Sequence, residues 1–217
     1  MSFVLTIAQR KGGAGKTTIA CHLTAALLAD ETRNVGSIDV DPQQSYTYWA
    51  NLRRERLGDT PRHIHTAAEG FRAIAETRRL KRDADIVIID APPHNDTAAR
   101  QAVRLADMVL IPMQLAPFDL AATADTARLV AQTSAAPLIL FNRTPARSRI
   151  ADEIRKRLAD LNVPTAPVEL GARTAYAESL LKGLGVTEAA PSSAAAKEMR
   201  QLTEYVLKQS AIMQKAA

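Results

Sequence analysis

A glycine-rich stretch near the N-terminus has the residue types and spacing that bind phosphate groups. It runs from Gln9 to Thr18 and reads Gln-Arg-Lys-Gly-Gly-Ala-Gly-Lys-Thr-Thr. The ordinary phosphate-loop pattern G-x-x-x-x-G-K-[ST] fails only at its first position, because residue 10 is arginine. Glycines allow backbone angles that aim successive N–H groups at an anion, and a following helix adds the positive end of its dipole. A chance glycine-rich turn is the alternative, but the full spacing between a strand and a helix favours a phosphate loop.

Different residues of this loop are predicted to contact different parts of a bound nucleoside triphosphate and its Mg²⁺ ion. Lys16 supplies a mobile positive charge for the β- and γ-phosphates, and the Thr17 hydroxyl is a ligand for Mg²⁺. We therefore expect ATP and Mg²⁺ to bind here, and we expect ATP to be hydrolysed. The residues predicted to contact the nucleotide in this loop are Gly12, Gly13, Ala14, Gly15, Lys16, Thr17 and Thr18.

Three carboxylates follow apolar segments that are predicted to be strands. Asp39 and Asp41 lie at and just after the end of Val35–Asp39, and Asp90 ends the β-branched run of residues 86–89. A carboxylate at a strand end can hold Mg²⁺ through a water, and phosphoryl transfer needs little beyond positioning and charge stabilisation. A lone Asp at a strand end is more often a turn or cap residue. Three of them beside a phosphate loop favour Asp90 as a metal residue, with Asp39 supporting the Mg²⁺ shell.

The elements that must position these residues alternate between strands and helices. This alternation predicts an α/β fold with a mostly parallel, doubly wound sheet and helices on both faces. In such sheets ligands bind at the carboxyl ends of the strands. We expect strands at Phe3–Gln9, Val35–Asp39, His63–Thr66, residues 86–90, Met108–Pro112 and Leu138–Phe141. We expect helices at Lys16–Leu28, Ser45–Leu57, Phe71–Arg82, Thr97–Ala106, Leu120–Thr133, Ile150–Leu161 and Ala194–Met213, with a loop over Gly183–Ser193.

Composition sets the class of protein. The 217 residues fit a single phosphate-loop ATPase domain over positions 1–217. No apolar run reaches the ~18 residues that would span a bilayer, and the first residues do not resemble a signal peptide. The single cysteine, Cys21, excludes an internal disulfide and reads as a small core residue in a cytoplasmic protein.

The extra lysine at position 11 gives the loop its particular character. With Lys11, the stretch closely resembles the deviant Walker A motif of the ParA/MinD family of ATPases. Ile38-Asp39-Val40-Asp41-Pro42-Gln43 and Ile88-Ile89-Asp90-Ala91-Pro92-Pro93 are similar to the family's second motif and its Walker B strand. Ser45, Trp49 and the segment Pro112–Asp119 resemble the small plasmid-partition ParA proteins in particular.

The resemblance implies roles for individual residues. Lys11 would reach across an ATP-bound homodimer to the partner's phosphates, and Asp41 would orient the attacking water. Asn142 resembles the family residue that hydrogen-bonds the adenine, although an Asn that ends a strand is often a turn residue. Pro191 would pack near the base.

A phosphate loop identifies the ligand and leaves the task open. The first interpretation is plasmid or chromosome partition. In this interpretation the ATP-bound dimer of this chain would bind DNA without sequence preference and associate with the nucleoid. It would be released from DNA when a ParB-like centromere-binding partner stimulates ATP hydrolysis. We also expect too little chain before the loop for a helix-turn-helix. Residues 143–217 hold 12 lysines and arginines against 8 acidic residues, within a net charge of +5. The candidate DNA-contacting residues are Arg143, Arg147, Arg149, Arg155, Lys156, Arg157, Arg173, Lys182, Lys197 and Arg200.

Two other classes stay open. A MinD-like or related ATPase would position a protein cluster, a cell-division site or a transfer-DNA complex. The tail over 208–217 has only Ile212 and Met213 as large apolar residues, so we expect no stable membrane anchor. A metabolic enzyme is the third class, but an iron–sulfur branch needs more cysteines than Cys21.

Some polar and aromatic residues are assigned no chemistry. His63 and His65 alternate along a short strand and share a face, without a cysteine or carboxylate cluster, so an exposed pair is the favoured reading. Tyr46, Tyr48 and Trp49 are expected to serve helix packing.

Overall fold

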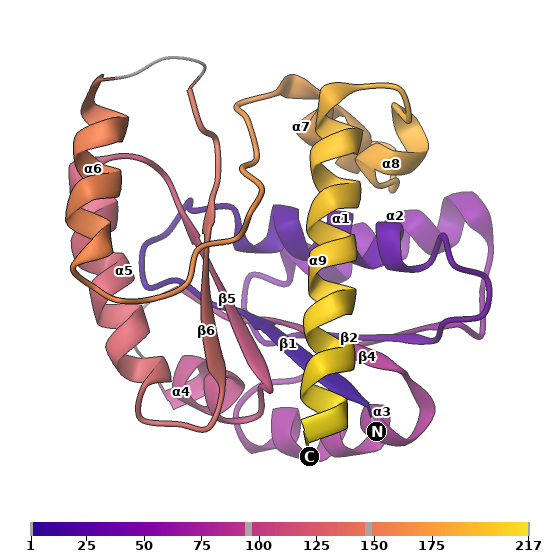
Figure 1. The fold of residues 1–217 in the computed structure, drawn as a ribbon. Helices are drawn as coiled ribbons and strands as arrows, with labels where there is room; N and C mark the ends of the chain where they lie inside the picture. The colour runs from indigo at the N-terminus through magenta and orange to yellow at the C-terminus, as the bar shows by residue number, and fades with distance from the viewer. Residues whose placement is uncertain (1, 94–96, 146–148, 217) are drawn as a thin grey trace.

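The fold is built on one parallel sheet. A computed structural model describes residues 2–93, 97–145 and 149–216 (Figure 1). In these residues six strands run in the order β3-β2-β4-β1-β5-β6, and every pairing is parallel. The strands are β1 (Phe3–Ile7), β2 (Val35–Asp39), β3 (His63–Ala67), β4 (Ile86–Asp90), β5 (Met108–Met113) and β6 (Ala136–Phe141). The expected doubly wound α/β class is confirmed.

The strand sequences explain why the sheet is covered on both faces. All five residues of β1, β2 and β4 are buried, and so are all six of β5. Apolar and β-branched side chains that point to both faces need a helix layer on each side to leave water. Only β3, at one edge, is half exposed along its length.

The helices form these two layers. One layer covers the sheet with α1 (Lys16–Leu27), α2 (Ser45–Leu57), α7 (Thr174–Leu180), α8 (Val186–Ala189) and α9 (Ala194–Ala216) (Figure 1). The opposite layer is made by α3 (Phe71–Asp83), α4 (Thr97–Arg104), α5 (Pro117–Val130) and α6 (Arg149–Ala159). None of the helices in the described ranges is both long and apolar enough to cross a bilayer.

The register of the central strands brings the phosphate loop and the acidic residues to one edge. Asp39 of β2 is level with Asp90 of β4, and Asp90 is level with Ile7, the last residue of β1. Parallel strands end at the same edge, so the loop after β1 lies beside both carboxylates. The functional residues are therefore gathered by strand register.

Several expected boundaries change. The segment Gly183–Ser193, expected as a loop, contains the short helix α8, and α7 precedes it. Neither helix has the long apolar periodicity that signals a helix in sequence. α5 begins at Pro117 rather than Leu120, because proline suits the first turn of a helix.

The reading of His63 and His65 as an exposed pair is wrong. Both side chains are half-buried and both contact the hydroxyl of Ser37 on β2. The prediction that Cys21, Tyr46 and Trp49 are packing residues is confirmed, since all three are buried in the core. The same prediction is wrong for Tyr48, which is 68% exposed.

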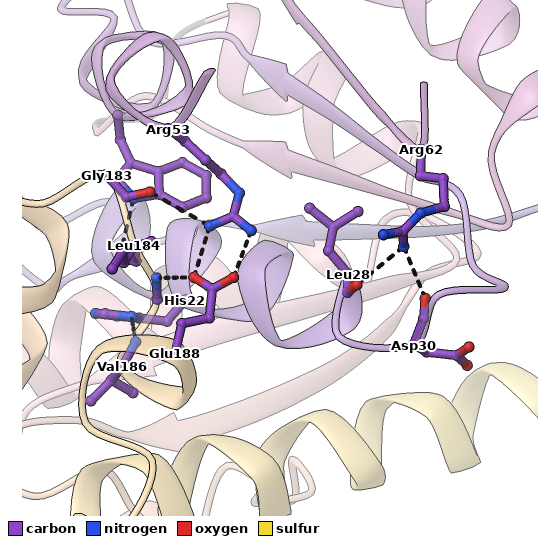
Figure 2. Close-up of polar contacts among 11 residues, drawn as sticks. His22, Leu28, Asp30, Arg53, Arg62, Gly183, Leu184, Val186 and Glu188 are labelled. Carbon is purple, nitrogen blue, oxygen red and sulfur yellow. Dashed lines mark hydrogen bonds and ion pairs between the residues drawn. The ribbon is translucent and has the colours of Figure 1, made fainter. Parts of the chain in front are cut away.

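The α8 segment is tied to α1 and α2 by polar contacts (Figure 2). Arg53 on α2 makes a bidentate ion pair with Glu188, with N–O distances of 2.7 and 2.6 Å. Glu188 also accepts the Gly185 backbone N–H at 2.7 Å. A planar guanidinium and a carboxylate joined in this way fix orientation as well as distance. These bonds hold the α7–α8 loop against α2.

His22 makes the matching contact from α1. Its Nδ1 accepts the backbone N–H of Val186 at 3.0 Å (Figure 2). Nε2 therefore carries the proton and donates it to the Tyr176 carbonyl at 3.1 Å. Burial lowers the pKa of His22 to about 4, with the Tyr176 carbonyl and Glu188 opposing the shift. His22 is therefore a neutral structural histidine.

This pKa predicts an acid-sensitive contribution to stability. The depressed native pKa means that the unfolded state binds more protons below pH 6.5, so stability is lost as pH falls from 6.5 toward 4. A single such histidine costs about 2 kcal/mol between pH 7 and pH 5. We expect His22→Gln, which retains one donor and one acceptor, to remove this part of the pH dependence in urea unfolding. Identical pH dependence in the two proteins would contradict the assignment.

Candidate functional site

The phosphate loop has the backbone shape that only glycine adopts easily. Gly13 and Gly15 have φ of 74° and 96°, in the left-handed region. Gly15 is the N-cap residue that directly precedes α1, and no side chain caps the helix. A Cβ on Gly15 would lie 2.3 Å from the Asn142 side-chain nitrogen, whereas one on Gly12 would meet nothing within 4 Å. The loop leaves the first backbone N–H groups of α1 open to an anion.

Side chains from other elements hold the loop in place. The Asn142 side chain donates to the Ala14 carbonyl at 2.7 Å, and Gln114 donates to the Gly13 carbonyl at 3.1 Å. Gln9 donates to the Thr123 hydroxyl on α5 at 3.0 Å. The sequence reasoning missed Gln9 and Gln114 as anchors, since the residue types alone carry no signal for such contacts.

Lys16 and Thr17 lie where the motif predicts. Burial lowers the pKa of Lys16, while the charges of Asp90 and Asp41 raise it. The Thr17 hydroxyl donates to Asp90 at 2.6 Å. The structure thus brings Lys16, the Thr17 hydroxyl and the Asp90 carboxylate together, and phosphate binding by Lys16 stays a prediction.

Asp90 has the burial and the free acceptor oxygen expected of a metal-binding carboxylate. It is 1% exposed, and its Oδ1 atom is buried without a hydrogen-bond partner. Burial raises its pKa to about 7, the Thr17 hydroxyl lowers it, and the charge of Asp39 raises it. An unpaired buried oxygen beside a threonine hydroxyl fits Mg²⁺, with Thr17 and Asp90 as the residues that would hold it. Among the described residues no group of three or more His, Cys, Asp or Glu side chains that could hold a metal ion is present.

Asp39 and Asp41 take different positions. Asp39 is buried, and its oxygens accept the Asp41 N–H at 3.1 Å and both the N–H and the hydroxyl of Thr47, at 2.8 and 3.0 Å. Burial raises the pKa of Asp39, and these bonds oppose the shift. Asp41 is half-buried at the edge of the site and accepts the Gln43 N–H at 3.0 Å. Asp39 thus holds the backbone of Asp41, and its role in the Mg²⁺ shell stays a prediction.

Lys11 is bound within its own chain. Its Nζ forms an ion pair with Asp119 in the first turn of α5, and the Asp119 side chain is fully buried. The neighbouring Arg10 pairs with Asp125 at 2.5 Å, also on α5. The sequence analysis assigned Lys11 to the phosphates of a second chain and did not predict the pair with Asp119, which lies 108 residues away.

A cavity of about 790 Å³ opens beside the loop. Gly15, Thr18 and Asn142 line one end, and α2 and α7 form much of the wall. Its surface is mainly apolar and suits a nucleobase. Asn142 faces this space as expected, but its Nδ2 is engaged with the loop and its contact with adenine stays a prediction. Pro191 does not line the cavity, and its carbonyl accepts a hydrogen bond from Arg200 at 3.0 Å.

The two glycines offer a matched test of the loop. Gly15→Ala forces a side chain into a left-handed backbone and against Asn142, so we expect a loss of about 2 kcal/mol in stability and loss of ATP binding. Gly12→Ala meets open space, and its stability should stay within about 0.5 kcal/mol of the parent. Urea unfolding and titration with a fluorescent ATP analogue measure both effects. Equal behaviour of the two variants would contradict the loop geometry.

Comparisons with known proteins show which family this chain belongs to. The model of the family described as ATPase MipZ matches residues 3–163. A "Maintenance of carboxysome distribution protein A" from Gloeobacter kilaueensis is 33% identical over 188 residues, covering 85% of this chain and 84% of the relative. "Protein ParA" from Rhizobium radiobacter is 31% identical over 184 residues, covering 80% of each.

Solved structures share the fold. The ATP complex of a Cyanothece McdA variant superposes with a TM-score of 0.78 at 18% identity, over 95% of this chain and 96% of that one. The septum site-determining protein MinD of Pyrococcus horikoshii, complexed with Mg-ADP, has a TM-score of 0.77 at 20% identity, over 98% and 99%. On the extent of the family match and the identity to its relatives, this chain belongs to the MipZ family of ATPases, within the ParA/MinD type of phosphate-loop ATPases.

Proposed function

We propose that this chain is a positioning ATPase in which ATP joins two copies into a dimer that binds DNA without sequence preference. A partner protein then stimulates hydrolysis and separates the dimer. The observation that carries the proposal is the second lysine of the loop. Lys16 lies beside Asp90 and would serve the chain's own phosphate site, whereas Lys11 pairs with Asp119 on α5. Lys11 is therefore the charge that a second chain's phosphates would recruit.

The hydrolytic step is assigned to residues at the carboxyl edge of the sheet. Asp41 would orient the attacking water, since it is partly exposed and its backbone is held by Asp39. Lys16 and the loop N–H groups would stabilise charge on the phosphates. Thr17 and Asp90 would hold Mg²⁺, which supplies further charge neutralisation when it is bound.

The DNA contact is supported by exposed lysines rather than by the whole basic set. Arg155, Arg157 and Arg173 form ion pairs with acidic neighbours. Arg147 lies outside the described residues. Among the described residues, the exposed cations of the set whose side chains make no ion pair or hydrogen bond are Lys156, Lys182 and Lys197.

The cargo has two candidates. Plasmid or chromosome partition with a ParB-like partner is favoured by the likeness of Ser45, Trp49 and Pro112–Asp119 to small plasmid-partition proteins. A protein assembly is favoured by two relatives that maintain carboxysome distribution, from Gloeobacter kilaueensis and, at 27% identity, Halothiobacillus neapolitanus. Deleting the gene and scoring plasmid loss against the placement of fluorescent protein clusters separates the two.

Asp41→Ala tests the hydrolytic assignment. We expect the variant to bind ATP and to accumulate as a dimer, with turnover reduced about 100-fold because the attacking water is no longer oriented. Lys16→Ala is the matched control that should lose ATP binding and stay monomeric. Analytical ultracentrifugation with and without ATP measures the dimer. Parent-like turnover in Asp41→Ala would remove this residue from the mechanism.

The salt dependence of DNA binding tests the surface. With three lysines per chain and six per dimer, duplex affinity should fall about 10³-fold between 50 and 200 mM salt. Lys182→Gln should reduce the slope of log affinity against log salt by about 1.8, because two charges leave the dimer. Fluorescence anisotropy with duplexes of unrelated sequence, with and without ATP, provides the measurement. Absence of binding at low salt would favour a positioning ATPase that does not use DNA.

A further inference from the structure

A line of hydrogen bonds runs from the edge strand β3 to the acidic edge of the site. His63 Nε2 and His65 Nδ1 lie 2.9 and 2.8 Å from the Ser37 hydroxyl. His65 Nε2 lies 3.0 Å from the Thr47 hydroxyl, which in turn lies 3.0 Å from Asp39. The line therefore joins β3, β2 and the first turn of α2 to a carboxylate beside the Walker B aspartate.

The direction of every bond in this line follows from its last member. Asp39 is an acceptor when ionised, so the Thr47 hydroxyl donates to it and must accept from His65 Nε2–H. His65 Nδ1 is then bare and accepts from Ser37, which in turn accepts from His63 Nε2–H. Burial lowers the pKa of His65 to about 4, which keeps this tautomer neutral. One arrangement of protons satisfies every group.

We propose that His65 is a positioning residue for ATP hydrolysis, acting through Thr47 to hold Asp39 and the backbone of Asp41. The inference rests on the proposed role of Asp41. The Asp39 side chain has to be held in place because strand register sets Asp39 level with Asp90, and their like charges repel. Two bonds from Thr47 to one oxygen of Asp39 oppose that repulsion. The His65 Nε2–H donates to the Thr47 hydroxyl, so this hydroxyl cannot turn its own proton toward His65 and donates it to Asp39.

A structural role alone would make a different prediction. His65 also packs edge-on against Tyr46, at 5.3 Å between ring centroids, so its loss removes packing as well as a hydrogen bond. A packing residue would be replaced best by an apolar side chain of similar size. A positioning residue would be replaced best by a side chain that keeps an N–H at the Nε2 position. Leucine and glutamine make this distinction at the same site.

The test compares His65→Leu with His65→Gln in the full chain. We expect His65→Leu to reduce kcat for ATP about 10-fold while the Kd for a fluorescent ATP analogue changes less than about twofold. His65→Gln should restore kcat to within about threefold of the parent. Thr203→Val removes a buried hydroxyl bond on α9, away from the line, and controls for a general loss of stability with parent-like kcat.

Each outcome decides between the readings. A parent-like kcat in His65→Leu overturns the inference, and so does an equal fall of kcat in the leucine and glutamine variants. Asp41→Ala, assayed in parallel, separates the two proposals. Normal turnover in Asp41→Ala removes the water-orienting role, whereas normal turnover in His65→Leu with a slow Asp41→Ala removes only the positioning role.

Discussion

Two carboxylates that lie side by side at the ends of β2 and β4 govern the rest of the site. Parallel register makes Asp39 and Asp90 neighbours, and both are buried. Burial raises both pKa values, and the charge of Asp39 adds to the shift at Asp90. The charge of Lys16 and the hydrogen bond from the Thr17 hydroxyl lower the pKa of Asp90, but they offset only part of its rise. A divalent cation bound here would relieve part of this unfavourable charge, and that relief would contribute to its binding free energy.

The contact between Lys11 and Asp119 is also governed by the cost of burying a carboxylate, but here an attractive ion pair offsets that cost. Asp119 is fully buried, so removing its cation would leave its carboxylate, among the described residues, with only the Gln114 backbone N–H, at 3.4 Å, and breaking such a pair is costly. In the proposed dimer, Lys11 would leave Asp119 only when another strong anion is within reach. A triphosphate on the second chain meets that requirement better than a diphosphate, because it carries more charge. The ion pair would then make dimerisation depend on ATP.

The sequence predicted those parts that local patterns determine. Runs of β-branched residues such as 86–89 identify strands buried on both faces, and the glycine–lysine spacing identifies the loop. Contacts between distant segments were not predictable, since Asp119 carries no local mark of its pairing with Lys11. The histidines of β3 were misread for the same reason. Their alternation showed a shared face, but only the pairing of β3 with β2 shows that Ser37 lies under it.

Helix α2 connects Asp39, at the carboxyl edge of the sheet, with the segment that contains α7 and α8. Its first turn donates to Asp39 through Thr47, and its later turns pair with Glu188 through Arg53. Gln44, which precedes α2, has a φ of 51°, an unusual backbone angle for a residue with a side chain. Because α2 is bonded at both ends, a displacement of Asp41 is absorbed at this junction or passed to the helix as a whole. The second course would move the wall of the cavity beside the phosphate loop, and the position of Asp41 would then depend on what occupies that cavity.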